Sequence, residues 1–142
     1  MRALLDVNVL IALLDSDHAH HSRAWDWFAA HASSGWASCP ITQNGCVRIM
    51  AQSAYPNRLP ISDVIERLSN ATAAAQHAFW PDDVSLLDSS VIDRRRVHGS
   101  KQVTDLYLLA LAVSRKGRLA TFDANVPTSA VRGATQKNLI VI

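Results

Sequence analysis

Residues 2–14, RALLDVNVLIALL, decide the fold that the rest of the chain is expected to adopt. Residues 2–5 form a short, mostly apolar run, which is typical of a buried strand, and the run ends at Asp6. Residues 7–14 are apolar at helical spacing, so we expect a helix that begins directly after Asp6. A strand, an acidic residue and a helix in this order predict the first unit of an alternating α/β chain.

The same alternation continues along the chain. Helical spacing predicts further helices over residues 21–32, 41–51, 63–75 and 103–114, the third of them capped by Ser62 and Asp63. Short apolar runs predict further strands over residues 36–38, 84–87, 118–122 and 139–142. No hairpin signal, internal repeat or linker interrupts this order. We therefore expect one domain over residues 1–142, with a mostly parallel central sheet between helices in a three-layer α/β/α architecture.

The composition excludes several classes of protein. The chain has 142 residues, of which 49% are hydrophobic and 18% are charged, and this is too apolar for a disordered chain. No apolar run approaches the roughly 18 residues that a membrane span needs. Cys39 and Cys46 are too few for a disulfide framework. We therefore expect a cytoplasmic protein with reduced thiols that is neither membrane-bound nor exported.

Charged residues are divided unevenly along the chain. Residues 1–93 hold five Lys or Arg against ten Asp or Glu, whereas residues 94–142 hold nine against two. A basic half favours a polyanionic partner, although a run of charges often does no more than solvate a surface. The residues expected to contact such a partner form the densest basic block, namely Arg94, Arg95, Arg96 and Lys101.

Three aspartates are expected to meet at one edge of the sheet. Asp6 and Asp123 each follow a predicted strand, and open α/β sheets bind ligands at the carboxyl ends of their strands. Asp105 lies at the start of the helix predicted over residues 103–114. Like charges at close range repel unless a cation neutralises them, and oxygen ligands favour Mg²⁺ or Mn²⁺. Each acid also has a purely structural interpretation, as an N-cap, a first-turn residue and a turn residue respectively.

Other polar residues near the first strand have simpler interpretations. Asn8 either starts the helix or orients Asp6 or a metal-bound water. A phosphatase of the haloacid dehalogenase type would have a second Asp where Asn8 stands, so this class is disfavoured. His18, His20 and His21 lack the spacing of a metal site and are expected to begin the next helix.

Four segments together resemble the PIN-domain ribonucleases, and in particular the VapC toxins of toxin–antitoxin pairs. They are LLDVNVLIALL at 4–14, CPITQNGCVRI at 39–49, VTDLYLLALAV at 103–113 and LATFD at 119–123. The resemblance implies a metal-dependent endoribonuclease in which Asp6, Asp105 and Asp123 hold Mg²⁺ or Mn²⁺ and activated water cuts a phosphodiester. Asn8 corresponds to a polar partner of the first acid. The resemblance also implies a homodimer and a neutralising VapB-type antitoxin whose tail occupies the groove.

Gln43 departs from the pattern of this family, which usually carries Glu at that position. An amide contributes no charge and cannot act as a base, so the site has one acid fewer than its relatives. Gln43 is still a candidate catalytic residue, because its carbonyl oxygen can ligate a metal or position a water. The alternative function is a PIN-like RNA- or partner-binding module in which this exchange has weakened or removed catalysis. Arg48 keeps the usual Arg of the segment, as a structural tie or a phosphate contact.

Overall fold

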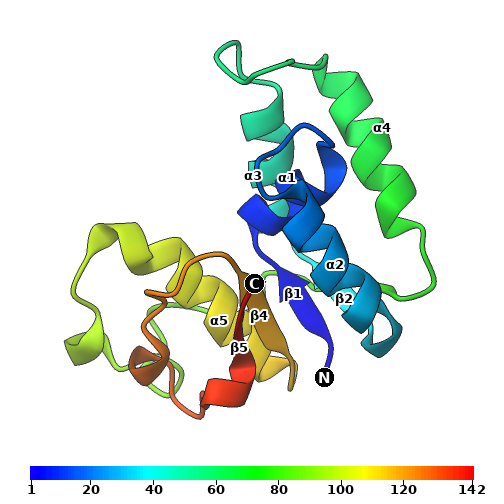
Figure 1. The fold of residues 1–142 in the computed structure, drawn as a ribbon. Coiled ribbons are helices and arrows are strands. Elements are labelled where there is room, and N and C mark those ends of the chain that lie inside the picture. The colour runs from blue at the N-terminus through cyan, green and yellow to red at the C-terminus, as the bar shows by residue number, and fades with distance from the viewer.

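The computed structural model describes all 142 residues, and its centre is a sheet of five parallel strands (Figure 1). The strands lie in the order β3-β2-β1-β4-β5, so the first strand of the chain is the middle one. Every neighbouring pair is parallel, which confirms the predicted sheet. The strands are Ala3–Leu5 (β1), Trp36–Ser38 (β2), His77–Phe79 (β3), Arg118–Thr121 (β4) and Leu139–Val141 (β5).

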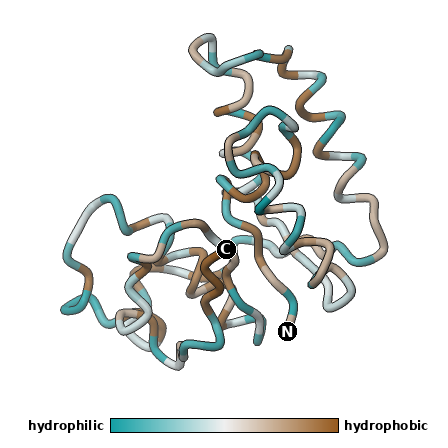
Figure 2. Tube along the Cα trace, viewed as in Figure 1, coloured by the Kyte–Doolittle hydropathy of each residue, from teal (hydrophilic) through white to brown (hydrophobic).

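Helices cover both faces of this sheet and give the three predicted layers. They are Val7–Leu14 (α1), His21–His31 (α2), Pro40–Met50 (α3), Ile61–Thr72 (α4) and Val103–Ser114 (α5). Leu4 packs in the core on the α5 side, whereas its neighbour Leu5 packs among α1, α3 and α4, because successive strand residues face opposite ways. Figure 2 shows hydrophobic residues gathered along α5 and the adjoining strands, with hydrophilic residues in the outer loops. None of the helices combines the length and the hydrophobicity that a membrane span requires.

The prediction of a strand over residues 84–87 is wrong, because the third strand, β3, lies earlier in the chain. Pro81 follows soon after β3 and cannot donate a hydrogen bond to a strand ladder. The chain then leaves the sheet, and Val84 and Leu86 pack against the core on the α5 side, whereas Leu87 is 94% exposed. The apolar residues of this segment therefore cover α5 and do not pair with a strand.

Other predicted boundaries agree with the structure to within three residues. The helix predicted over residues 63–75 is α4, which begins two residues earlier and ends three residues earlier than expected. Pro60 occupies the N-cap position, so Ser62 and Asp63 lie in the first turn and do not cap the helix. Proline lacks the N–H that would go unbonded at a helix start, which suits this place.

Gly45 allows α3 to lie against the first turn of α1. A Cβ atom at Gly45 would lie 2.7 Å from Cγ2 of Val7, a distance at which one of the two helices has to shift. Val7 is β-branched and has little freedom to turn aside within a helix. The contact therefore fixes α3 against the part of α1 that carries Asp6 and Asn8.

We expect Gly45→Ala to lower the free energy of unfolding by roughly 1–2 kcal/mol, because the cost of overpacking exceeds the gain in helix propensity. Urea denaturation followed by circular dichroism measures the difference. Gly99→Ala is the matched control, since its added Cβ would meet no atom closer than 4.0 Å. Shortening Val7 to Ala in the Gly45→Ala background should restore stability, and an unchanged Gly45→Ala protein would contradict the close contact.

Candidate active site

The functional edge of the sheet follows from the order of its strands. From β1 the chain continues to β2 and β3 on one side, and it later adds β4 and β5 on the other side. Ligands bind such sheets in the crevice outside the carboxyl ends of the strands where the order reverses, here between β1 and β4. Asp6 follows β1 directly, and Asp123 stands two residues beyond β4. Both predicted acids therefore lie at this crevice.

Asp6 is the buried member of the site, with 5% of its surface exposed. Its Oδ1 accepts the Val7 N–H at 2.7 Å, which makes it the N-cap of α1, and its Oδ2 accepts the Thr121 hydroxyl at 2.7 Å. Burial raises the pKa of the Asp6 carboxyl, the charge of Asp123 adds to the rise, and the two hydrogen bonds oppose it. The N-cap interpretation is thus correct, and the capped carboxylate also faces other acids.

Asp105 lies in the first turn of α5, as predicted, and is partly buried. Burial raises the pKa of this carboxyl to about 6, and the negative charges of Asp6 and Asp123 contribute to the rise. Electrostatic repulsion therefore couples the three aspartates that the sequence singles out. Residues more than 100 positions apart in the chain meet here because β1 and β4 are neighbours.

Thr121 connects two of these acids, and sequence analysis did not identify it. Its hydroxyl donates to Asp6, and the same oxygen accepts the Asp123 N–H at 3.1 Å. The exposed Asp123 side chain accepts the Asn125 N–H at 2.7 Å. Asp123 is therefore also a turn residue, which was its purely structural interpretation. The sequence feature that could have indicated Thr121 is a hydroxyl residue at the end of a predicted strand, two positions before an acid.

A cavity of about 540 Å³ brings Asp6 and Asp105 together with Asn8. Arg48 of α3 is the one cationic residue in its lining, and Asp123 stands outside it. The other residues of the wall are Val7, Ile41, Asn44, Gly45, Ile49 and Thr104. The wall thus combines two acids with small polar groups, an arrangement that can hold a cation and a water molecule.

Gln43 does not line this cavity. Its side chain lines a neighbouring cavity of about 610 Å³ between α3 and α4, together with Arg48. The Gln43 amide donates to Ser38 Oγ at 2.9 Å, and this oxygen lies 2.8 Å from Nε2 of His77. Burial lowers the pKa of His77, with Arg2 adding to the effect and a hydrogen bond to the Thr72 main chain opposing it. A neutral imidazole can accept the Ser38 hydroxyl hydrogen, so the amide at position 43 completes a chain of hydrogen bonds.

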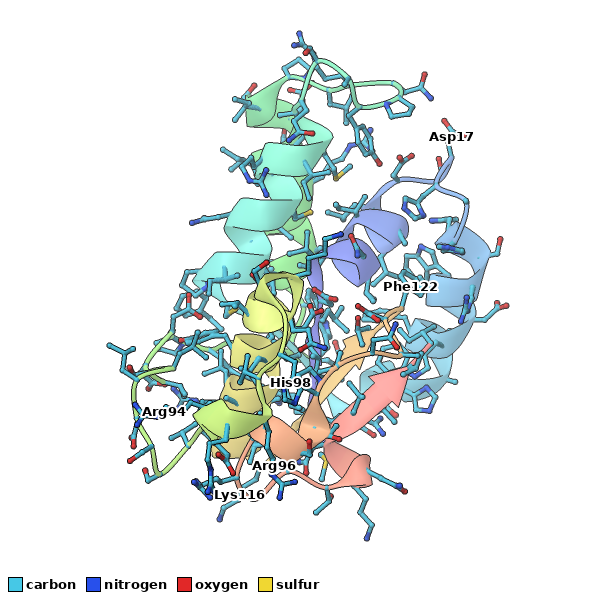
Figure 3. All side chains as sticks on the ribbon, turned by 90° about the vertical axis from the view of Figure 1, so that its left-hand side faces the viewer. Asp17, Arg94, Arg96, His98, Lys116 and Phe122 are labelled. Atoms are coloured by element: carbon cyan, nitrogen blue, oxygen red, sulfur yellow. The ribbon has the colours of Figure 1, made fainter.

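The basic block predicted to contact RNA also lies outside the acidic cavity. Figure 3 shows Arg94 and Arg96 toward the end of the molecule at which Lys116 lies. Lys116 follows the last turn of α5, whereas Asp105 is in its first turn. Arg94 and Arg96 therefore lie away from the first turn of α5, whereas Lys101, in the turn directly before α5, lies at the same end of the helix as Asp105.

Part of this basic block is used within the protein. Asp93 forms ion pairs with Arg95 at 3.1 Å and with Arg96 at 3.5 Å. Arg94 forms no ion pair, and Lys101 is exposed in the turn that precedes α5. The density of charge along the sequence did not indicate which cations the fold would neutralise.

No cation of the protein forms an ion pair with the three site acids, since the ion pairs of the structure involve only Asp83 and Asp93. Carboxylates with raised pKa values and no cationic partner suit a divalent ion. No three His, Cys, Asp or Glu side chains are arranged to hold one ion in common. Magnesium needs only one or two carboxylates because it keeps several waters. Asp6 and Asp105, which share the cavity, are therefore the donors that fit.

The fold and its acidic edge define a PIN-domain protein, and the family described as PIN domain matches residues 3–130. The chain is 54% identical to ribonuclease VapC44 of Mycobacterium tuberculosis over 142 residues, which is 100% of both proteins. It is 46% identical to ribonuclease VapC39 of the same organism over 137 residues, covering 96% of this chain and 99% of that relative. The chain therefore belongs to the VapC family of PIN-domain ribonuclease toxins.

Two solved structures share the fold at low sequence identity. VapBC2 from Rickettsia felis, bound to a DNA fragment from the promoter, has a TM-score of 0.63 at 11% identity and covers 100% of this chain and 98% of its own. VapC20 of Mycobacterium tuberculosis, a toxin that cleaves the sarcin–ricin loop, has a TM-score of 0.62 at 11% identity, covering 94% and 97%. These likenesses confirm the PIN-like α/β fold that the sequence predicts.

The raised pKa of Asp105 predicts an unusual dependence of stability on pH in metal-free protein. The folded pKa of about 6 exceeds the ordinary value of 3.8, so folding takes up a proton between these values. The free energy of unfolding therefore falls as pH rises from about 4 to about 6 and stays lower above that range. Because Asp105→Asn removes this effect, we expect the variant to have a higher Tm than wild type near pH ~7 in EDTA and an equal Tm near pH ~4. Asp26→Asn, at an exposed position on α2, is the control, and equal Tm values at both pH values would contradict the prediction.

Proposed function

We propose that this chain is a metal-dependent endoribonuclease toxin that hydrolyses RNA phosphodiesters with water activated at the edge of the sheet. The observation that carries the proposal is the set of three electrostatically coupled carboxylates, Asp6, Asp105 and Asp123, without any cationic partner in the protein. Membership of the VapC ribonuclease family supports the same reaction. A bound Mg²⁺ or Mn²⁺ would stabilise charge on phosphoryl oxygen and lower the pKa of a water.

The residues of the cavity have separate roles in this proposal. Asp6 and Asp105 hold the ion, and Asp123 adds negative charge from the rim. Thr121 and the start of α1 hold the Asp6 carboxylate in one orientation through its two hydrogen bonds. Asn8 provides an amide in the wall of the cavity that can orient a water beside the ion. Arg48 supplies the positive charge that a phosphate needs at this acidic edge.

The basic second half of the chain is proposed to hold RNA outside the cavity. Arg94 and Lys101 are exposed and form no ion pair, so both are free to contact phosphates. Arg95 and Arg96 share the charge of Asp93 and contribute less. RNA binding should then weaken steeply with salt, because these contacts release counterions.

The proposal includes two protein partners. The VapC family supports a VapB-type antitoxin that neutralises the toxin, and one structure with the same fold is a VapBC2 complex. The resemblance that the sequence carries also supports a homodimer. Family membership supports both assemblies, whereas the geometry of the acidic cavity supports the metal site.

Asp6→Asn and Asp105→Asn test the metal site. With Mg²⁺ or Mn²⁺ and bulk RNA, we expect each exchange to reduce cleavage roughly hundredfold or more, since loss of groups that merely support metal ligands already costs 10–100-fold. Asp26→Asn should cleave as wild type does. Metal-dependent cleavage that survives both exchanges would place the reaction at another site.

The second candidate function is a non-cleaving RNA- or partner-binding module, and the amide of Gln43 is the observation that favours it. On that hypothesis Gln43→Glu should switch cleavage on. Because Gln43 hydrogen-bonds to Ser38 outside the acidic cavity, we expect the exchange to change cleavage by less than about tenfold. A carboxylate at position 43 should instead raise the pKa of His77 through Ser38.

Nuclear magnetic resonance titration of the His77 ring measures this pKa in wild type and Gln43→Glu. Gln52→Glu, which adds the same charge at an exposed position after α3, is the control. An unchanged His77 pKa would contradict the hydrogen-bond chain. A large gain in cleavage, with a silent wild type, would favour the binding module over the nuclease.

A further inference from the structure

Three planar side chains gather beside the acidic edge without belonging to the acidic cavity. Phe122 is the first residue after β4. Its ring centroid lies 5.0 Å from that of His20, with an angle of 41° between the two ring planes. The guanidinium carbon of Arg23 lies 5.5 Å from the centroid of the Phe122 ring. Figure 3 shows Phe122 at the end of β4, on the side toward α2. We refer to these three residues as the edge platform.

The edge platform presents two exposed side chains with few polar partners in the protein. His20 occupies the N-cap position of α2 but its side chain forms no capping hydrogen bond. The Arg23 guanidinium donates to the main-chain oxygen of Ile142. Both side chains are exposed, whereas Phe122 beneath them is half-buried and anchored against the core. The core therefore holds Phe122 in place, while the side chains of His20 and Arg23 that contact it are accessible to a ligand.

The place of the edge platform relates it to the acids. Thr121, the last residue of β4, donates its hydroxyl to Asp6, and Phe122, the first residue after the strand, packs against the core cluster of α1, α3 and α4. Asp123 follows immediately and contributes charge to the acidic site. The edge platform therefore adjoins the acidic site through the end of β4, where Thr121 contacts Asp6 and Asp123 adds its charge.

We propose that the edge platform, His20, Arg23 and Phe122, is a subsite that stacks one nucleobase of single-stranded RNA next to the phosphodiester held at the acids. This inference rests on the proposed nuclease function and names the part of the substrate that the site recognises. Bases stack on aromatic rings and on guanidinium planes, and the cation of Arg23 adds attraction for a base or its phosphate. Stacking tolerates any base, so the edge platform selects unpaired RNA rather than a sequence.

An acidic peptide is the competing ligand, and charge alone would bind it. The two ligands differ in what they require of the protein. A peptide carboxylate needs the charge of Arg23, which Lys supplies equally well. A base needs flat surfaces, which Arg23→Lys and Phe122→Leu remove while preserving charge and apolar volume respectively.

The test compares two fluorescent probes of equal length and charge, an oligoadenylate and an abasic strand with the same sugar-phosphate backbone. Fluorescence anisotropy is measured with the full chain in EDTA, so that no cleavage occurs and the repulsion from the acids is common to both probes. We expect wild type to bind the oligoadenylate on the order of tenfold more tightly than the abasic strand. His20→Ala, Arg23→Lys and Phe122→Leu should each reduce that preference several-fold.

His31→Ala is the matched control, because His31 stacks on Trp27 at the other end of α2, with ring centroids 5.0 Å apart. It should keep the preference of wild type. Thermal denaturation checks that the variants fold, and the exposed positions of His20 and Arg23 keep the test valid if Phe122→Leu is unstable.

Two results would overturn the edge platform. One is equal binding of both probes by wild type. The other is a loss of affinity in the variants that is the same for both probes, or a base preference that Arg23→Lys leaves unchanged, since either pattern reports charge without stacking. Failure of the nuclease proposal looks different, because it appears as cleavage that survives both Asp6→Asn and Asp105→Asn and leaves the binding comparison in EDTA unaffected.

Discussion

A buried carboxylate at the end of the middle strand is the constraint on which the rest of the fold depends. Asp6 is 5% exposed, and an ionised carboxyl is costly to bury without partners. The chain supplies those partners from its next residue, Val7, and from Thr121, which lies 115 positions away. These hydrogen bonds join β1 to α1 and to the end of β4. The group that is most costly to bury is thus also the junction of three elements.

The same hydrogen bonds limit the rise in the pKa of the Asp6 carboxyl. Burial and the charge of Asp123 favour the neutral form of Asp6, whereas its two hydrogen bonds favour the charged form. Asp105 has no comparable support, and its pKa rises to about 6. Burial, and after it the charges of Asp6 and Asp123, therefore disfavour the ionised form of Asp105, which lines the same cavity as Asp6. A divalent ion would favour the ionised form, so binding the ion would stabilise the folded protein.

The sequence predicted the layers, the parallel sheet and the edge at which the acids meet, because these features depend on periodicity and on the residue that follows each strand. It misplaced β3, since residues 84–87 are as apolar as a strand but cover α5 instead. It could not show that Gln43 turns toward Ser38, because the two sides of α3 line different cavities. The sequence could not identify Thr121, because its hydrogen bond to Asp6 depends on the pairing of β4 with β1.

The sequence also could not show how far each basic residue lies from the acids. α5 has 12 residues and is about 18 Å long, roughly twice the Debye length of about 8 Å at physiological salt. Arg94 and Arg96 lie toward the Lys116 end of the molecule (Figure 3), so salt screens their charges from a phosphate held beside Asp105. They can act only on phosphates that a longer RNA brings to them. Arg48 lines the acidic cavity and Lys101 lies in the turn directly before α5, so these two cations are placed to influence a phosphodiester held there.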